Sequence, residues 1–332
     1  MTSARDVVSM AILGGVFSVA AISLALDFLA PNMMATTIVA FSFVVGAGGI
    51  SILLGIRHSY KNLGCFEPGN IGKGKVVVTE TGIPCTDGIV LPAYVYRTPD
   101  VVIDGDAAGK KSGFLFIHGF SGTPEDGECY TKALAVAGFV CMTYAQRGQG
   151  RRKKAPGRRT EWWRIWQDFA AVLDAFLSLP DVDANHVFVM GHSLGANLAM
   201  TKAYDDPRVK AVIALSGMPI QEMLPSSAGR PRPRFASMFK RFFEGSGLTL
   251  DQGLASIAPM ANVPEHDSRA KDRVFLIHCR DDFFPMVMFM KVKEWFDVPD
   301  EHCLMLDHGG HKAEGQSAII VAQLISWLAA LK

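Results

Sequence analysis

The sequence predicts an α/β fold with a mostly parallel sheet, preceded by two membrane-spanning helices. Short apolar runs alternate with amphipathic segments from about residue 75 onward. This pattern is typical of parallel strands whose connecting helices cover both faces of the sheet. A Gly-x-Ser-x-Gly motif lies between one of these strands and the helix that follows it, and two long apolar segments precede the whole region.

The two N-terminal apolar segments are long enough to cross a bilayer. The segment at 7–30 has Asp27 as its only charge, and the segment at 33–56 has none. Each would form a helix roughly 36 Å long, which exceeds the hydrocarbon thickness. A signal peptide is the alternative for the first segment, but its apolar part is too long and a second span follows at once. We therefore expect a membrane hairpin over residues 1–56, rather than a buried helical pair of a soluble protein.

The positive charges predict how this hairpin is oriented. Arg5 precedes the first span, the turn between the spans has no positive charge, and four basic residues follow the second span: Arg57, Lys61, Lys73 and Lys75. The positive-inside rule then places both ends of the hairpin, and the rest of the chain, in the cytoplasm. The six cysteines lack C-x-x-C spacing and most lie in apolar runs, which suits reduced thiols in that compartment.

Glycines and prolines mark residues 57–74 as a linker, so the α/β domain is predicted over residues 75–332. Its expected strands lie at 75–80, 90–96, 112–117, 139–144, 187–190, 209–215, 273–278 and 303–306. Its expected helices lie at about 125–137, 161–179, 194–200 and 316–331.

A long insertion separates the strand that ends near Ser216 from the strand that begins at Arg273. It covers about residues 217–272 and contains several prolines and a basic, aromatic stretch at 234–243. A usual crossover between parallel strands needs far fewer residues. We expect the insertion to fold over the serine of the motif as a cap; a surface excursion without contact to substrate is the alternative.

The Gly191-His192-Ser193-Leu194-Gly195 motif joins an expected strand to an expected helix. This context identifies a nucleophile elbow, in which the serine adopts a strained backbone conformation at a sharp turn. Glycines on both sides leave room for the chain to turn that tightly. Ser193 is therefore the candidate nucleophile.

Two later strands supply candidate partners for Ser193. Asp282 follows the expected strand at 273–278, and His311 follows the expected strand at 303–306. A serine hydroxyl attacks poorly unless a neighbouring base takes its proton. We expect His311 to be that base, and Asp282 to hold its tautomer and stabilise the imidazolium.

Each of these two residues has a rival nearby. Asp281 is adjacent to Asp282, but the spacing from the end of the strand favours Asp282. His308 is three residues before His311 and could pair with it as a metal site. No carboxylate or cysteine stands at a complementary spacing, so we expect no metal and no cofactor.

Several motifs together resemble those of the α/β-hydrolase superfamily, over roughly residues 75–332. They are His118-Gly119-Phe120, Arg147-Gly148-Gln149-Gly150, the elbow around Ser193, Asp282, and Gly310-His311. The chain order of serine, acid and histidine is also that of the superfamily. The nearest resemblance is to its esterase, monoacylglycerol-lipase and serine-aminopeptidase-like branches. Many relatives have an aspartate where this chain has Ala145-Gln146, and a second glycine where Ala196 stands.

The resemblance implies a serine hydrolase that works through an acyl-enzyme. The backbone N–H groups of Phe120 and Leu194 would form the oxyanion hole, and His118 would support that loop. With the expected hairpin, the sequence predicts a membrane-anchored enzyme that cleaves carboxylic esters, possible substrates being lipid-derived acyl esters. The alternatives are a serine peptidase for short peptides, and a catalytically silent member of the superfamily that acts as a membrane receptor or scaffold.

A basic run is the strongest charge feature of the chain. It comprises Arg147, Arg151, Arg152, Lys153, Lys154, Arg158 and Arg159. Contact of Arg151, Arg152, Lys153 and Lys154 with anionic lipid headgroups is one interpretation, and a solvated loop is the other. The formal net charge of +1 and the lack of a nucleic-acid motif argue against a nucleic-acid partner.

Overall fold

The computed structural model describes the chain from residue 76 onward, with gaps: residues 76–98, 109–149, 156–157, 159–217, 220, 240, 243 and 245–331. Among these residues, no helix combines the length and apolarity that crossing a bilayer requires. The two expected spans, at 7–30 and 33–56, and the linker at 57–74 lie outside the described residues.

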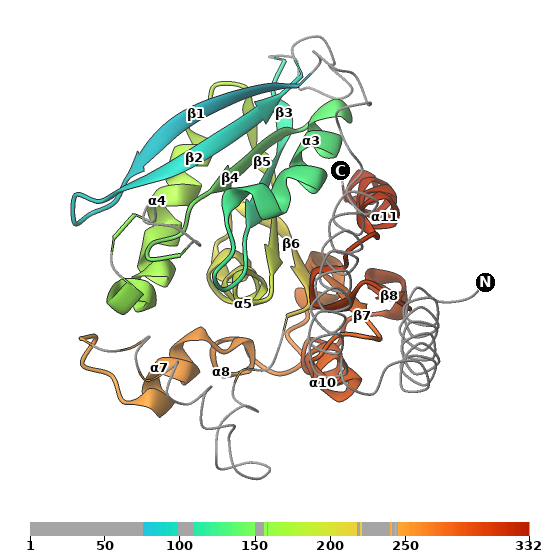
Figure 1. Cartoon of the computed structure of the whole chain (residues 1–332). Coiled ribbons are helices and arrows are strands. Elements are labelled where there is room, and N and C mark those ends of the chain that lie inside the picture. Colours follow the sequence, from blue (N-terminus) through green and yellow to red (C-terminus); the bar gives the residue numbers. More distant parts are fainter. Residues whose placement is uncertain are drawn as a thin grey trace, which may run out of the picture. The chain divides into compact units, whose positions relative to one another are not determined.

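An eight-stranded sheet forms the centre of the described part, with strand order β1-β2-β4-β3-β5-β6-β7-β8 (Figure 1). Strand β2 runs antiparallel to both of its neighbours, β1 and β4, and all other neighbouring pairs are parallel. The strands are β1 Val77–Pro84, β2 Val90–Arg97, β3 Lys111–Ile117, β4 Val140–Tyr144, β5 Val182–His192, β6 Val209–Leu215, β7 Val274–Cys279 and β8 Cys303–Leu306.

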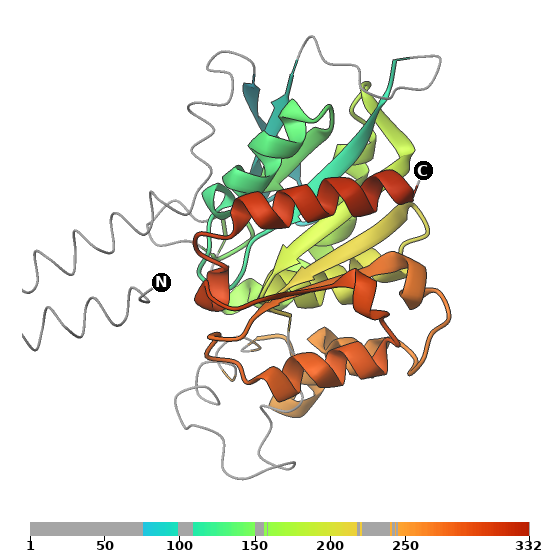
Figure 2. The ribbon, with the colours of Figure 1, turned by 90° about the vertical axis from the view of Figure 1, so that its right-hand side faces the viewer.

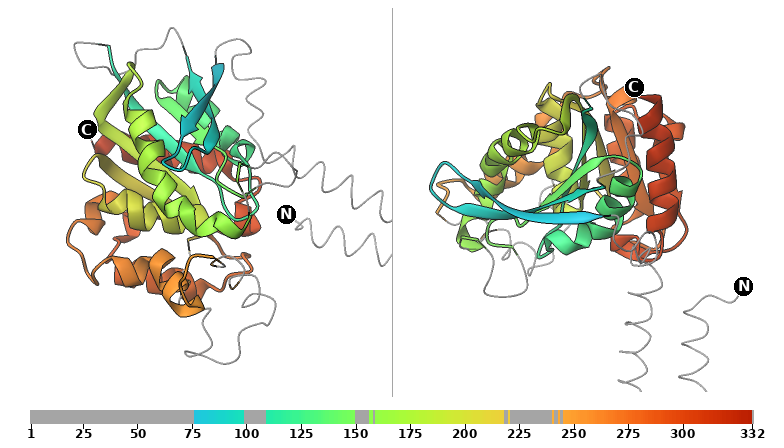
Figure 3. Two further views of the ribbon diagram at one scale, coloured as in Figure 1. Left: turned by 90° about the vertical axis from the view of Figure 1, so that its left-hand side faces the viewer. Right: turned by 90° about the horizontal axis from the view of Figure 1, so that it is seen from above.

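Helices cover both faces of this sheet. Two of them, α3 (Glu128–Val136) and α11 (Ser317–Ala330), lie on one face (Figure 2). On the other face lie α4 (Ile165–Leu177) and α5 (Leu194–Leu198), with α10 (Met286–Trp295) packed into the same core (Figure 3).

The central strands are buried on both sides because each side chain faces one of these two cores. In β3, Phe114 and Phe116 belong to the core under α3 and α11, whereas Leu115 and Ile117 belong to the core under α4. This explains why the sequence shows continuous apolar runs for β3 to β7 rather than alternation. The predicted mostly parallel sheet is therefore confirmed.

The strands and helices predicted for the α/β domain are confirmed to within a few residues, except at one strand. Strand β5 begins at Val182, five residues before the expected start at 187. After the buried Val182, the extra residues 183–186 are partly or fully exposed and mostly polar, and the register with β3 shifts before Gly113. The apolar run therefore indicated only the buried half of this strand.

The described end of the long insertion packs on the domain. It contains α7 (Leu250–Ile257) and α8 (Pro259–Asn262), followed by the short α9 (Ala270–Arg273). Leu254 and Ile257 are buried in the same core as α4 and α5. Most of the first half of the predicted cap lies outside the described residues, so a cap over Ser193 stays a prediction.

Arg147 corrects one part of the sequence interpretation, because it does not belong to a basic surface. Its side chain is 1% exposed and forms paired hydrogen bonds with Asp168, at 2.8 and 2.8 Å, and with Asp87, at 2.6 and 3.0 Å. The hydrogen bonds from Arg147 hold the pKa of Asp87 down, at about 2. Arg147 therefore fastens the β1–β2 hairpin to α4.

Arg151, Arg152, Lys153 and Lys154 lie outside the described residues, and their contact with lipid stays a prediction.

Replacing Arg147 should destabilise the protein far more than replacing an exposed arginine. Arg147→Met leaves the buried Asp168 carboxylate without its partner, so we expect the free energy of unfolding to fall by about 3–5 kcal/mol. Arg208→Met is the control, because Arg208 also binds two carboxylates but is 43% exposed; its loss should cost about 1 kcal/mol or less. Urea unfolding of both variants measures the difference, and equal losses would contradict the role assigned to Arg147.

Candidate active site

The turn between β5 and α5 holds Ser193 in a strained conformation. Its φ and ψ are 53° and −113°, outside the regions that a serine normally adopts. Gly191 and Gly195 make the turn possible, because a Cβ on Gly191 would collide with the Gly195 carbonyl, and one on Gly195 with the Ile117 carbonyl. The glycines of the motif are therefore required by close backbone contacts.

The structure brings Ser193, His311 and Asp282 together, although they follow three different strands. The distance from His311 Nε2 to Ser193 Oγ is 2.8 Å. On the other side of the ring, His311 Nδ1 lies 3.0 Å from each carboxylate oxygen of Asp282. Strands β5, β6, β7 and β8 lie side by side in this order and run parallel. The residues that follow β5, β7 and β8 therefore lie at the same edge of the sheet, where the carboxyl ends of the strands meet.

The surroundings of Asp282 favour its charged form. Burial opposes ionisation, since the side chain is 0% exposed. The hydrogen bond from His311 and the 2.9 Å bond from the Phe284 N–H outweigh that effect and lower the pKa of Asp282 below its usual value. An ionised carboxylate only accepts hydrogen bonds. His311 Nδ1 therefore carries the proton, and Nε2 presents its lone pair to the Ser193 hydroxyl.

Asp281 holds the loop that carries His311. Its carboxylate accepts hydrogen bonds from the N–H groups of Gly309, at 3.3 Å, and Gly310, at 2.7 Å. Both glycines have positive φ, which suits the tight turn before His311. The two adjacent aspartates thus have different partners. Asp282 binds the His311 imidazole, and Asp281 binds the backbone N–H groups of the two glycines before His311.

His192 is a further contact that sequence reasoning missed. Its Nε2–H donates to the His311 carbonyl at 2.8 Å, and the two rings lie 5.0 Å apart. Burial and the nearby His311 lower the pKa of His192 to about 3, so the ring is neutral. The variable residue of the Gly-x-Ser-x-Gly motif therefore holds the backbone of His311, a contact that the motif itself does not reveal.

The loop after β3 lies against Ser193. A Cβ on Gly119 would lie 3.2 Å from Ser193 Cβ, so the next residue, Phe120, begins its turn beside Ser193. Leu194 is the first residue of α5, and its N–H is one of those that have no partner within a helix. The structure thus brings both expected oxyanion residues to the neighbourhood of Ser193.

The loop after β4 fixes this oxyanion loop in two places. The Gln146 N–H donates to His118 Nε2 at 3.1 Å, while His118 Nδ1 donates to the Gly119 carbonyl at 2.9 Å. Gln149 Oε1 accepts a hydrogen bond from the Ser121 N–H at 2.7 Å. Burial lowers the pKa of His118 to about 4, which keeps this ring neutral. The Arg-Gly-x-Gly pattern pointed to this loop, but not to the role of Gln149.

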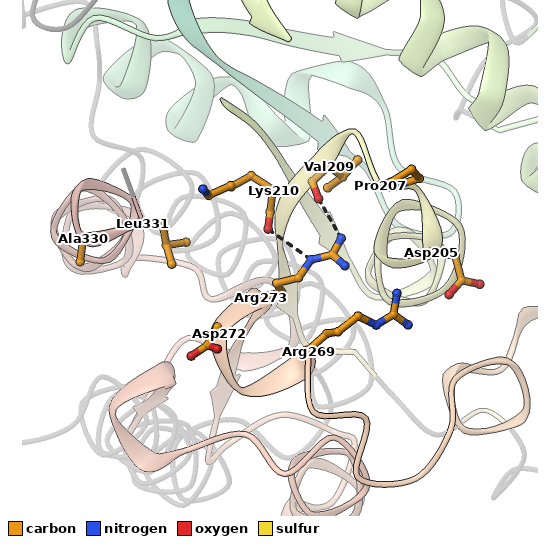
Figure 4. Close-up of a pocket in the computed structure, with 9 residues that line it drawn as sticks. All are labelled: Asp205, Pro207, Val209, Lys210, Arg269, Asp272, Arg273, Ala330 and Leu331. Carbon is orange, nitrogen blue, oxygen red and sulfur yellow. Dashed lines mark hydrogen bonds between the residues drawn. The ribbon is translucent and has the colours of Figure 1, made fainter. Parts of the chain in front are cut away.

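A pocket lies away from Ser193, at the end of the sheet where β6 and β7 begin (Figure 4). Arg273 donates hydrogen bonds there to the carbonyls of Tyr204, Val209 and Lys210, at 3.0, 2.8 and 3.3 Å. Its guanidinium therefore joins the end of the helix after Ser193 to β6. Arg273 therefore has a structural role here. The pocket lies where β6 and β7 begin, whereas Ser193 follows the opposite, carboxyl end of β5.

No group of three histidine, cysteine or acidic side chains within the described ranges is arranged to hold a metal ion.

The strand order, the strained serine after β5 and the hydrogen bonds from serine to histidine to aspartate define an α/β-hydrolase. The family model described as "Serine aminopeptidase, S33" matches residues 109–282, more than half of the chain. The protein therefore belongs to this family of hydrolases.

Several characterised and uncharacterised proteins are similar to this chain. The uncharacterized protein YcjY of Escherichia coli is 29% identical over 147 residues, 44% of this chain and 46% of the relative. The 2,6-dihydropseudooxynicotine hydrolase of Paenarthrobacter nicotinovorans is 28% identical over 135 residues, 40% of this chain and 33% of the relative. The chain thus spans less than half the length of these two relatives.

The fold is shared with solved structures of low sequence identity. An acetyl xylan esterase from a Paenibacillus species superposes with a TM-score of 0.56 at 17% identity, covering 82% of this chain and 92% of the esterase. At this identity the comparison supports the fold alone.

Because His192 and His118 are neutral and buried, we expect the free energy of unfolding to fall in mild acid. The pKa values of His192 and His118 are about 3 and about 4 in the folded protein, against about 6.5 when unfolded. Between pH 6.5 and 4 the unfolded chain therefore binds protons that the folded chain does not. Each histidine should lower the free energy of unfolding by about 1.4 kcal/mol per pH unit as the pH falls through this window.

Urea unfolding of the His192→Gln variant at several pH values from 4.5 to 7 tests this. The stability of the variant should fall less steeply than that of the wild type, by about 1.4 kcal/mol per pH unit. His266→Gln is the control, because His266 is 60% exposed and should leave the slope unchanged. Identical slopes for wild type and His192→Gln would show that His192 is not a neutral buried ring.

Proposed function

We propose that this protein is a serine hydrolase that cleaves carboxylic esters through an acyl-enzyme on Ser193. The observation that carries the proposal is the continuous hydrogen bonding from Ser193 Oγ to His311 Nε2, at 2.8 Å, and from His311 Nδ1 to Asp282, at 3.0 Å. This arrangement gives the hydroxyl a base that already holds the right tautomer.

In the first step, Ser193 Oγ attacks the ester carbonyl carbon while His311 Nε2 takes its proton. The resulting imidazolium faces the ionised Asp282, which stabilises the positive charge. The C–O bond to the leaving alcohol breaks as His311 returns the proton to the alcohol oxygen. Water then attacks the acyl-enzyme with the same base, which releases the acid and restores Ser193.

The developing negative charge on the carbonyl oxygen requires donors next to Ser193. We assign this role to the N–H groups of Leu194 and Phe120. The helix that begins at Leu194 adds a favourable dipole at the same point. Gln149 and His118 hold the Phe120 loop in place through the bonds at 2.7 and 2.9 Å, so this site is formed before substrate binds.

Esters fit the described residues better than peptides with a free amino terminus. An aminopeptidase needs an acceptor for the substrate ammonium group. Three carboxylates around His311 and the oxyanion loop already have partners: Asp282 binds His311, Asp281 binds Gly310, and Asp126 binds Lys312 at 2.9 Å. The name of the family supports the peptidase as the second candidate. A scaffold without activity is disfavoured, because it would have no need of the strained Ser193.

A panel of acyl esters and aminoacyl amides tests the proposed activity. We expect the whole chain to hydrolyse the esters with much larger kcat/KM than the amides. Ser193→Ala should lower ester kcat by about 10³-fold or more. Ser178→Ala is the control, because the exposed Ser178 follows the end of α4 and its hydroxyl donates to the Ala175 carbonyl. Wild-type activity in a folded Ser193→Ala variant would contradict the proposal, and a preference for the amides would favour the peptidase.

We further propose that residues 1–56 anchor the enzyme in a membrane, with the hydrolase domain on the cytoplasmic side. The support is the length and apolarity of the segments at 7–30 and 33–56, and the positive charges around them. Lipid-derived acyl esters would then be accessible substrates.

Extraction of membranes from expressing cells tests the anchor. The whole chain should stay in the membrane pellet after an alkaline carbonate wash and dissolve only in detergent, because two spans bury about 40 apolar residues in lipid. Release of the chain by the wash alone would contradict the anchor while leaving the proposed ester hydrolysis untouched.

A further inference from the structure

Three large apolar side chains are exposed beside the candidate active site. Phe283 is 66% exposed, Val287 is 58% exposed and Met290 is 48% exposed. Val287 and Met290 are three residues apart in α10, so they lie on one face of the helix. Phe283 comes before the helix and directly after Asp282. We call these three side chains the α10 ridge.

The α10 ridge begins in contact with the catalytic base proposed above. The ring centroids of Phe283 and His311 are 4.3 Å apart, and His311 Nε2 lies 2.8 Å from Ser193 Oγ. Phe284, the next residue, points inward and is 9% exposed, with its ring 5.0 Å from His311. One aromatic ring therefore supports the base from inside, and the other presents an apolar surface to solvent.

The apolar exposure is confined to the end of α10 that is near His311. Met286 to Met290 contains no charged residue, whereas Lys291, Lys293 and Glu294 follow in the second half. The opposite face of the helix, with Phe289 and Val292, is buried in the core. A surface helix normally exposes polar residues opposite its buried face. An apolar exposed face next to a site therefore indicates a binding surface.

We propose that the α10 ridge binds the acyl chain of the substrate and selects aliphatic acyl groups longer than acetyl. This inference rests on the proposed ester hydrolysis at Ser193. An acyl group on Ser193 lies beside His311, and Phe283 is the first apolar surface beyond that ring. A longer chain then continues over Val287 and Met290. Each methylene buried there should raise kcat/KM by about fourfold.

A series of p-nitrophenyl esters from acetate to octanoate, kept below their aggregation limits, tests the inference on the whole chain. For the wild type we expect kcat/KM to rise by about sixteenfold from butanoate to hexanoate, which differ by two methylenes. In Val287→Ser/Met290→Ser this ratio should fall to about twofold or less, because the serines offer little apolar surface. Met290→Gln keeps the side-chain length and should give a hexanoate-to-butanoate ratio between these two values. It replaces the double variant in the test if that variant is unstable.

Ile319→Ser/Ile325→Ser is the matched control. Both residues are exposed apolar side chains of a helix, at 53% and 37%, but they lie on α11, and we expect the wild-type ratio. An unchanged ratio in Val287→Ser/Met290→Ser would overturn the acyl-binding role and leave the ester hydrolysis intact. If those substitutions instead alter only self-association or vesicle binding, the ridge docks a second copy or a lipid surface. No turnover of any ester by the wild type would reject the proposed function itself.

Discussion

The close approach of two backbone segments at the elbow is the constraint on which the rest of the site depends. Strand β5 ends at His192, and the chain turns so tightly that the first residues of α5 pack against Gly191 and against the Ile117 carbonyl of β3. Ser193 then has to adopt a positive φ, at a cost on the order of 1–3 kcal/mol. Two well-packed cores around the sheet offset this strain.

The partners of Ser193 are then set by strand order rather than by sequence distance. Strands β5, β6, β7 and β8 lie side by side and parallel, so an acid after β7 and a histidine after β8 arrive at the same edge. Both partners of Ser193 are held by two contacts. Asp282 accepts hydrogen bonds from the Phe284 N–H and from His311. The loop of His311 is bound by Asp281 and by His192. The imidazole of His311 is therefore held in one orientation beside Ser193.

Sequence reasoning found what depends on motif and periodicity, and missed what depends on contacts between distant segments. The strands follow from apolar runs, and the three residues Ser193, Asp282 and His311 follow from their places after those strands. The buried state of Arg147 was missed, because its partners Asp87 and Asp168 are 60 and 21 residues away. The same limit applies to Gln149 and Ser121, whose bond joins two separate loops.

The hydrogen bonds around Ser193 should give its hydroxyl the reactivity of an activated nucleophile. Reaction of the whole chain with a fluorophosphonate, followed by mass mapping of the adduct, measures this without a choice of substrate. We expect a single adduct on the peptide that contains Ser193, formed slowly or not at all when His311 is replaced by alanine. A folded protein that does not react, or an adduct on another serine, would contradict it.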